Sequence, residues 1–178
     1  MTTYTFRPPS SSQNNYAWHD PTIWIPAVVP NAPDADVVIP TVTKSDGSIF
    51  FSSIGSSFES FAIHSLSLTN NTLHLDGSTL AVGGNVDLLA GSNLTLSSGA
   101  ILTAAALSNT RFVTGNGNSQ ITVAGTLTNT GDIFGSGLTV TAQQLNNAGS
   151  LTGSLGGLTV NVTVPDLAAR CKAAHTSR

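Results

Sequence analysis

Short runs of alternating apolar and polar residues recur along most of this sequence, most clearly between positions 107 and 160. Aligning Leu107 with Leu127 and then with Leu145 brings similar residues together at many of the following positions. The matched columns include Asn109, Asn129 and Asn147; Val113, Ile133 and Leu151; and Gly115, Gly135 and Gly153. Self-similarity at such a nearly constant step indicates a stacked repeat.

Each aligned segment closes with a threonine between two apolar residues, as in Ile121-Thr122-Val123. This period of two places both apolar side chains on one side of an extended strand, whereas a helix would need a period of 3.6. About three such strands, separated by Gly, Asn or Ser, fill one repeat. The pattern therefore predicts an all-β fold, a parallel β-helix (β-solenoid) with three short strands in each coil of about 17–20 residues. Because the spacings do not fit the strict six-residue repeat of a left-handed helix, we expect a right-handed coil.

Domain boundaries follow from changes in composition. Residues 1–47 contain seven of the eight prolines and both tryptophans, and we interpret them as an N-terminal cap over the exposed end of the first coil, with Trp18 and Trp24 as its candidate lid. Residues 48–164 are the predicted solenoid, since no proline interrupts a ladder between Thr41 and Val164. Residues 165–178 are predicted to be a tail or a short capping helix behind Asp166, or the place where a longer protein was cut.

Two sets of side chains repeat with the coils. The column of Asn109, Asn129 and Asn147 is expected to form a structural amide ladder at one corner, and the glycine column to mark backbone turns. The central threonines are expected to point outward in one row at a spacing of ~4.8 Å, which is our candidate ligand-binding surface. That row consists of Thr95, Thr122, Thr139 and Thr159. Threonine is also simply a common strand residue on a solvent face.

The low charge of the chain limits the possible partners. Charged residues make up 8% of the sequence, against about 25% in an average soluble domain. No basic patch is present to bind a phosphate backbone, so we do not expect nucleic acid as a partner. The apolar runs are too short for a transmembrane helix, and the N-terminus lacks the layout of a secretory signal peptide, so export would use another signal.

Catalytic and metal-binding patterns are weak. The four histidines are scattered, and Asp34, Asp36 and Asp46 lack the dense oxygen-ligand spacing of a calcium loop, so we expect no metal and no cofactor. Hydrolytic carboxylates would have to converge from distant coils, for example Asp76 and Asp132. Because no nucleophile, phosphate-loop or zinc motif accompanies them, the chain is not expected to be an enzyme.

A family resemblance is carried by the N-terminal motifs. Trp18-His-Asp-Pro-Thr-Ile-Trp24, Val29-Pro30-Asn31 and Asp36-Val-Val-Ile-Pro40 run into Ser65-Leu-Ser-Leu and the Leu-Thr-Val repeats. From about Tyr4 to Val164 the chain resembles the N-terminal β-solenoid region of large bacterial secreted or surface repeat proteins, such as haemagglutinin-like adhesins and autotransporter passengers. The resemblance implies a right-handed β-helix outside the cell or at its surface.

We therefore expect a non-catalytic structural or adhesive module that acts as a stalk, scaffold or adhesin. Its expected partners are surface glycans, or copies of itself stacked at the coil ends, without membrane insertion. One alternative is a carbohydrate-active β-helix enzyme, which would show Asp and Arg lining a cleft. Another is an ice or crystal-surface binder, which would need a flat threonine face at least two rows wide.

Overall fold

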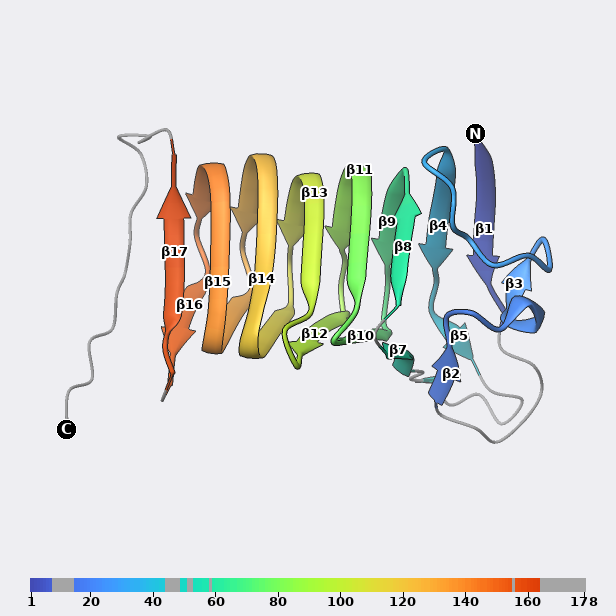
Figure 1. The fold of residues 1–178 in the computed structure, drawn as a ribbon, viewed down its shortest axis with the longest axis horizontal. Coiled ribbons are helices and arrows are strands. Elements are labelled where there is room, and N and C mark those ends of the chain that lie inside the picture. Colours follow the sequence, from blue (N-terminus) through green and yellow to red (C-terminus); the bar gives the residue numbers. More distant parts are fainter. Residues whose placement is uncertain (8–14, 44–48, 51–52, 58, 155, 164–178) are drawn as a thin grey trace.

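The computed structural model describes residues 1–7, 15–43, 49–50, 53–57, 59–154 and 156–163. Within these residues the chain is almost entirely β-strand and coils around one long axis (Figure 1). In Figure 1 the near strands run upward and the far strands run downward while the chain advances from right to left, which makes the coil right-handed. The predicted right-handed β-solenoid is therefore confirmed, whereas the predicted C-terminal tail or capping helix lies outside the described residues.

Three parallel ladders run along the rod, and we call them faces A, B and C. Face A contains β2 (Asn15–Ala17), β7 (Ser53–Ser57), β10 (Thr72–Asp76), β12 (Asn93–Ser97), the first parts of β14 (Phe112–Asn129) and β15 (Asp132–Asn147), and β16 (Ser150–Gly153). Face B contains β8 (Ser60–Ile63), the first parts of β11 (Thr79–Leu88) and β13 (Ile101–Asn109), the middle parts of β14 and β15, and β17 (Leu158–Val162). Face C contains β1 (Thr2–Phe6), β4 (Ala35–Ile39), β9 (Ser65–Leu68) and the last parts of β11, β13, β14 and β15.

Successive coils differ slightly in length. Equivalent positions on face A are Thr72, Asn93, Phe112, Asp132 and Ser150, whose sequence spacing changes from coil to coil. On face B, Thr79 is followed one coil later by Ile101, a step longer than any of those on face A. The coils therefore span about 18 to about 22 residues, slightly beyond the predicted range of about 17–20 residues. The reason is that the corners vary, with residues 89–92 between faces C and A in one coil but only residues 110–111 in the next.

Inward side chains from all three faces fill one continuous core. Buried and outward residues alternate along each strand, as in β10 and β12, which is the period-two arrangement predicted from the sequence. Gly115 and Gly135, which we expected at turns, instead lie within β14 and β15 and are buried. A Cβ atom on Gly115 would lie 2.6 Å from Leu138 Cδ1, and one on Gly135 would lie 2.9 Å from Leu158 Cβ. These glycines therefore make room for inward leucines.

The asparagine column forms the predicted ladder at the corner between faces C and A. Asn109 Nδ2 donates to Asn129 Oδ1, and Asn129 Nδ2 donates to Asn147 Oδ1, both at 2.7 Å. The same amides also donate to backbone carbonyls of the corners, including those of Asp132 and Ser150. Asn109 and Asn129 are completely buried. These three coils are thereby attached to one another by side chains as well as by their strands.

The N-terminal residues extend the same sheet. β1 pairs in parallel with β4, and β4 pairs in parallel with β9, so face C continues beyond the first complete coil. The antiparallel strand β3 (Trp24–Ile25) then covers the outer edge of β1. It follows the short 3₁₀ helix η1 (Pro21–Ile23), while β5 (Val42–Thr43) and β6 (Ile49–Phe50) form a separate antiparallel pair. The domain boundary predicted at residue 47 stays a prediction, since residues 44–48 lie outside the described part.

Two buried tryptophans close this end of the core. Trp24 Nε1 donates to the carbonyl of Trp18 at 2.9 Å, and Trp18 Nε1 donates to the carbonyl of Pro30 at 3.1 Å. The Trp18 ring packs 5.0 Å from the Trp24 ring and 5.6 Å from the ring of Phe61, which belongs to the first strand of face B. Both indole N–H groups are satisfied while both rings are buried, as a tryptophan lid requires.

Candidate functional site

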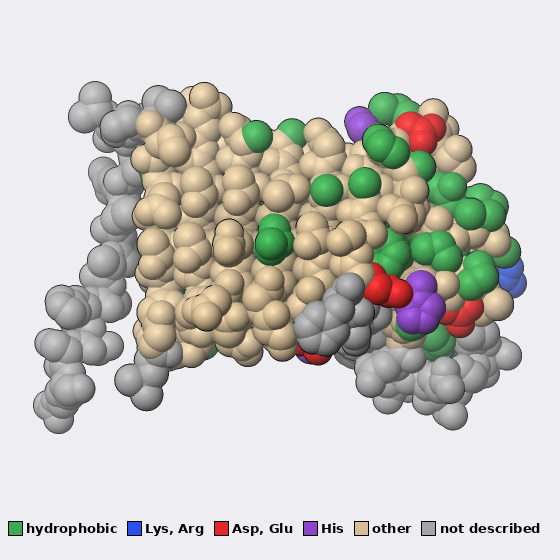
Figure 2. Space-filling view, viewed as in Figure 1, with side chains coloured by type: hydrophobic (Ala, Val, Ile, Leu, Met, Phe, Trp, Pro, Cys, Tyr) green, Lys and Arg blue, Asp and Glu red, His purple; other side chains and the backbone are tan. Residues whose placement is uncertain are grey.

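Uncharged polar side chains cover most of the coils. Figure 2 looks onto face B and shows charged and hydrophobic side chains gathered at the N-terminal end, over the residues that precede the first complete coil. Along the coils themselves, from residue 60 to residue 163, the charged residues are Asp76, Asp87, Arg111 and Asp132. Any contact made by the coils therefore depends chiefly on hydroxyl, amide and aromatic groups.

The four predicted ligand-binding threonines do not form one row. Thr95 lies on face A, whereas Thr122, Thr139 and Thr159 lie on face B. Within face B, Thr139 and Thr159 are ladder partners, but Thr122 is displaced from their row by two residues and pairs with Thr141. The prediction of a single row is wrong in its geometry, because the corners that precede equivalent strands differ in length.

Face B does carry threonines in two parallel rows, but both rows are incomplete. One outward row is formed by Ala81, Thr103, Thr122, Thr141 and Asn161. The neighbouring row is formed by Thr79, Ile101, Gln120, Thr139 and Thr159. Two threonines stand side by side in only one of these coils, at Thr139 and Thr141. This is less than the two-row array that an ice-binding surface would need.

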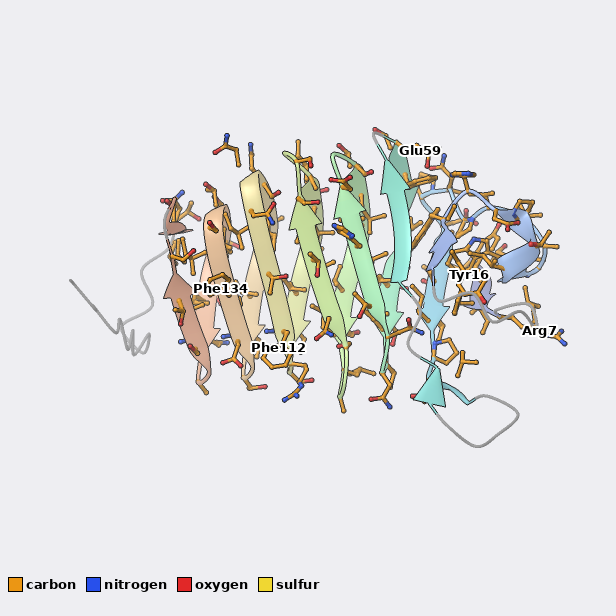
Figure 3. All side chains as sticks on the ribbon, turned by 90° about the horizontal axis from the view of Figure 1, so that it is seen from below. Arg7, Tyr16, Glu59, Phe112 and Phe134 are labelled. Carbon is orange, nitrogen blue, oxygen red and sulfur yellow. The ribbon has the colours of Figure 1, made fainter. Side chains whose placement is uncertain are left out.

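Two phenylalanine side chains point outward from neighbouring coils of face A. Phe112 begins the strand β14 and pairs with Asp132, whereas Phe134 lies in β15 and pairs with Thr114. Phe134 is 39% exposed, and the guanidinium carbon of Arg111 lies 4.3 Å from the centre of the Phe112 ring. Figure 3 views the rod from below, toward face A, and labels both rings. We call Arg111, Phe112, Thr114, Asp132 and Phe134 together the Phe112/Phe134 block.

The repeat alignment does not single out this block, although the sequence contains a signal for it. Val113 and Ile133 share one column of the aligned repeats, and both are buried in the structure. Phe112 and Phe134 each stand next to one of these residues, so the period of two places both rings on the outer side. Large aromatic residues at outward positions of polar strands are the feature that could have indicated a site.

Hydroxyl and imidazole groups surround Asp36, on face C. Ser65 Oγ donates to Asp36 Oδ1, and His64 Nδ1 donates to the same oxygen at 2.8 Å. These hydrogen bonds, that of Ser65 first, hold the pKa of Asp36 below its ordinary value of 3.8. Because the serine donates to the carboxylate and not to the imidazole, the three residues do not have the arrangement of a serine hydrolase triad.

A similar cluster surrounds Asp76 on face A. The hydroxyls of Ser98 and Ser97 lower the pKa of Asp76 below 3.8 by hydrogen bonding. The Ser97 hydroxyl donates to Asp76 Oδ1 at 2.7 Å, and His74 Nε2 lies 2.9 Å from Ser97 Oγ. In this cluster too the serine proton is directed at the carboxylate. Both clusters therefore attach neighbouring coils to each other rather than activate a nucleophile.

Stability should fall in acid as Asp36 becomes protonated. Its lowered pKa contributes stability that is fully present above pH 3.8 and is lost as the pH falls through the folded-state pKa. Asp36→Asn is therefore expected to have a lower Tm than wild type at pH 6, and the difference should shrink as the pH falls below 3.8. Thermal unfolding followed by circular dichroism across this range tests it. Ser65→Ala keeps the carboxylate but removes its main hydrogen-bond donor, so its Tm difference from wild type should also shrink as the pH falls. A Tm difference that is constant with pH would contradict a stabilising role of the ionised Asp36.

The example pair of carboxylates that a hydrolytic activity would need is not brought together. Asp76 and Asp132 both lie on face A, but three ladder steps separate their coils. At ~4.8 Å per step the separation is at least about 14 Å, beyond the roughly 5–9.5 Å of glycosidase carboxylates. In the part of the chain that the structure describes, no three His, Cys, Asp or Glu residues are grouped so that they could hold a metal ion. A search of the same residues finds no helix long and apolar enough to cross a membrane.

Comparison with protein-family models, with curated proteins and with solved structures finds no match to this chain. Its β-solenoid fold agrees with the resemblance drawn from the N-terminal motifs and the repeats. The finer part of that resemblance, membership of the bacterial secreted repeat proteins, stays a prediction, as does self-association at the coil ends.

Proposed function

We propose that this chain is a non-catalytic structural and adhesive β-solenoid module of a bacterial secreted or cell-surface protein. The observation that supports this function best is the uninterrupted parallel ladder through five coils, whose outward positions carry hydroxyl and amide groups and few charges. Coils stacked in this way form a stiff linear array. Uncharged polar groups can exchange hydrogen bonds with a glycan surface at a lower desolvation cost than charged groups.

Adhesion of the whole chain tests the proposal. Labelled protein is incubated with insoluble polysaccharides and bacterial cell-wall preparations, and both the retained protein and newly formed reducing ends are measured. We expect retention on at least one preparation without new reducing ends. Reducing ends that disappear in Asp76→Asn or Asp132→Asn would favour the alternative of a carbohydrate-active enzyme, whereas absence of retention on every preparation would contradict an adhesive function.

The predicted role of the threonine hydroxyls can be resolved face by face in the same assay. Thr95→Val changes face A alone, and the triple variant Thr122→Val, Thr139→Val, Thr159→Val changes face B alone. Valine preserves the shape of the side chain and is favoured in strands, so both variants should keep the fold. Weaker retention of only one of them identifies the adhesive face.

A further inference from the structure

From β10 to β16, the outward rows of face A that contain the two phenylalanines are otherwise polar. Phe112 shares its row with Thr72, Asn93, Asp132 and Ser150, and Phe134 shares its row with His74, Thr95, Thr114 and Thr152. Both rings stand on the side of the sheet opposite to the core, so the core does not require them. A single exposed apolar residue needs no explanation, but here two large rings occur in adjoining coils of one small region.

The two rings lie on a diagonal of the ladder. Phe112 and Phe134 are one ladder step and two residues apart, which places their Cα atoms roughly 7–8 Å from each other. Thr114 and Asp132 occupy the other diagonal of the same square. Arg111 brings its guanidinium donors onto the Phe112 ring. The region thus combines two aromatic surfaces with a hydroxyl group, a carboxylate acceptor and a guanidinium donor.

From this arrangement we propose that the Phe112/Phe134 block binds a neutral polysaccharide chain laid along face A. The face of an aromatic ring is electronegative and its body is apolar, so an exposed ring such as that of Phe134 suits the polarised C–H groups on the flat face of a hexose ring. One face of the Phe112 ring is already covered by Arg111, and its remaining surface adds apolar contact beside Phe134. Asp132 accepts from sugar hydroxyls, while Arg111 donates to them. One cation and one anion leave the block without net charge, which favours a neutral glycan over an acidic one.

Other classes of partner fit the block less well. A stable protein partner would bury about 800 Å² of this chain around an apolar centre, whereas the rows on either side of the rings carry hydroxyl, amide and imidazole groups. A nucleic acid would need several cations along its phosphates, and Arg111 is the only lysine or arginine between residues 60 and 163. The observations therefore favour a sugar chain.

This inference rests on the proposed adhesive function and is tested separately by affinity electrophoresis of the whole chain. The gels contain hydroxyethylcellulose or galactomannan as neutral probes, or polygalacturonate as an acidic probe. The double variant Phe112→Asn, Phe134→Thr introduces the residues found at Asn93 and Thr114 in the preceding coils. The control variant Ile101→Gln removes an outward apolar side chain from face B and introduces the residue of the next coil, Gln120.

We expect wild type to be retarded by at least one neutral polysaccharide, and the double variant to bind it about tenfold more weakly or worse. Ile101→Gln should bind like wild type, and both variants should keep the wild-type circular dichroism spectrum. Equal binding by the double variant overturns the inference, as does retardation of wild type by polygalacturonate alone or by no probe. Retention on cell walls would still support the adhesive function in each of these cases, so the two proposals fail independently.

Discussion

Replacing Asn129 by alanine is expected to lower the free energy of unfolding by about 3 kcal/mol. Asn129 is completely buried and is the middle member of its ladder. The two hydrogens of its amide are shared among three acceptors, Asn147 Oδ1 and the carbonyls of Gly131 and Ser150, and its oxygen accepts from Asn109. Alanine removes all of these contacts and leaves the buried amides and carbonyls around it without their partner. Thermal unfolding should show a Tm about 6–12 °C below that of wild type.

A matched control lies on the next coil. Asn146 is exposed on face C, where it pairs with Thr128 in the ladder, so Asn146→Ala removes an amide that points into water. Its free energy of unfolding should stay within about 0.5 kcal/mol of wild type. If the two variants had the same Tm, the buried amide ladder would not contribute to stability and its repeated asparagines would need another explanation.

The asparagine ladder shows what the sequence alone could predict. A residue type that recurs once in every coil lies in one column along the axis. This requires that the number of residues between it and the next strand is the same in each coil. This holds for Asn109, Asn129 and Asn147, which are ladder partners in three successive coils. The coil period, the alternation within strands and this structural role follow from the same simple condition.

The prediction of one threonine row is wrong because the corners before the equivalent strands do not have the same number of residues. The strand 138–142 contains two overlapping apolar-Thr-apolar triplets, Leu138-Thr139-Val140 and Val140-Thr141-Ala142, and the ladder pairs the second of them with Ile121-Thr122-Val123. A slip of one residue would turn every side chain to the other face, but a slip of two residues leaves inward and outward positions unchanged. The hydrophobic pattern therefore cannot choose between the two registers.

The strand pairing of the N-terminal part could not be predicted from the repeat. Tyr4, Val37 and Leu66 are successive partners on face C, yet each lies much further from the next in the sequence than one coil of the rod. Because this spacing is far from the period of the coils, nothing in the sequence aligns β1 and β4 with the later strands. Burial of Trp18 and Trp24 was expected, since large aromatic residues are suited to cover an open core.

Gly131→Ala is expected to destabilise the chain by about 3 kcal/mol, as overpacking against atoms that cannot move aside does. A Cβ atom on Gly131 would lie 2.2 Å from the carbonyl oxygen and 2.5 Å from the nitrogen of Arg111, in the coil below. These are backbone atoms of a corner whose strands are fixed in the ladder, so they cannot turn away as a flexible side chain would. Chemical denaturation, with Tm as a second measurement, should show the loss.

Gly83→Ala provides the opposite expectation at another corner. The nearest atom to a Cβ atom on Gly83 is the carbonyl oxygen of Ile63 at 3.8 Å, which is ordinary contact, and Gly83 does not have a positive φ. Alanine there should leave stability unchanged or raise it by up to about 1 kcal/mol, because it restricts the unfolded chain without straining the folded one. If the free energy of unfolding falls in Gly131→Ala but does not fall in Gly83→Ala, the corner at Gly131 is closed by direct contact between backbones. If Gly131→Ala were as stable as Gly83→Ala, successive coils could not stack as tightly at that corner as the structure shows.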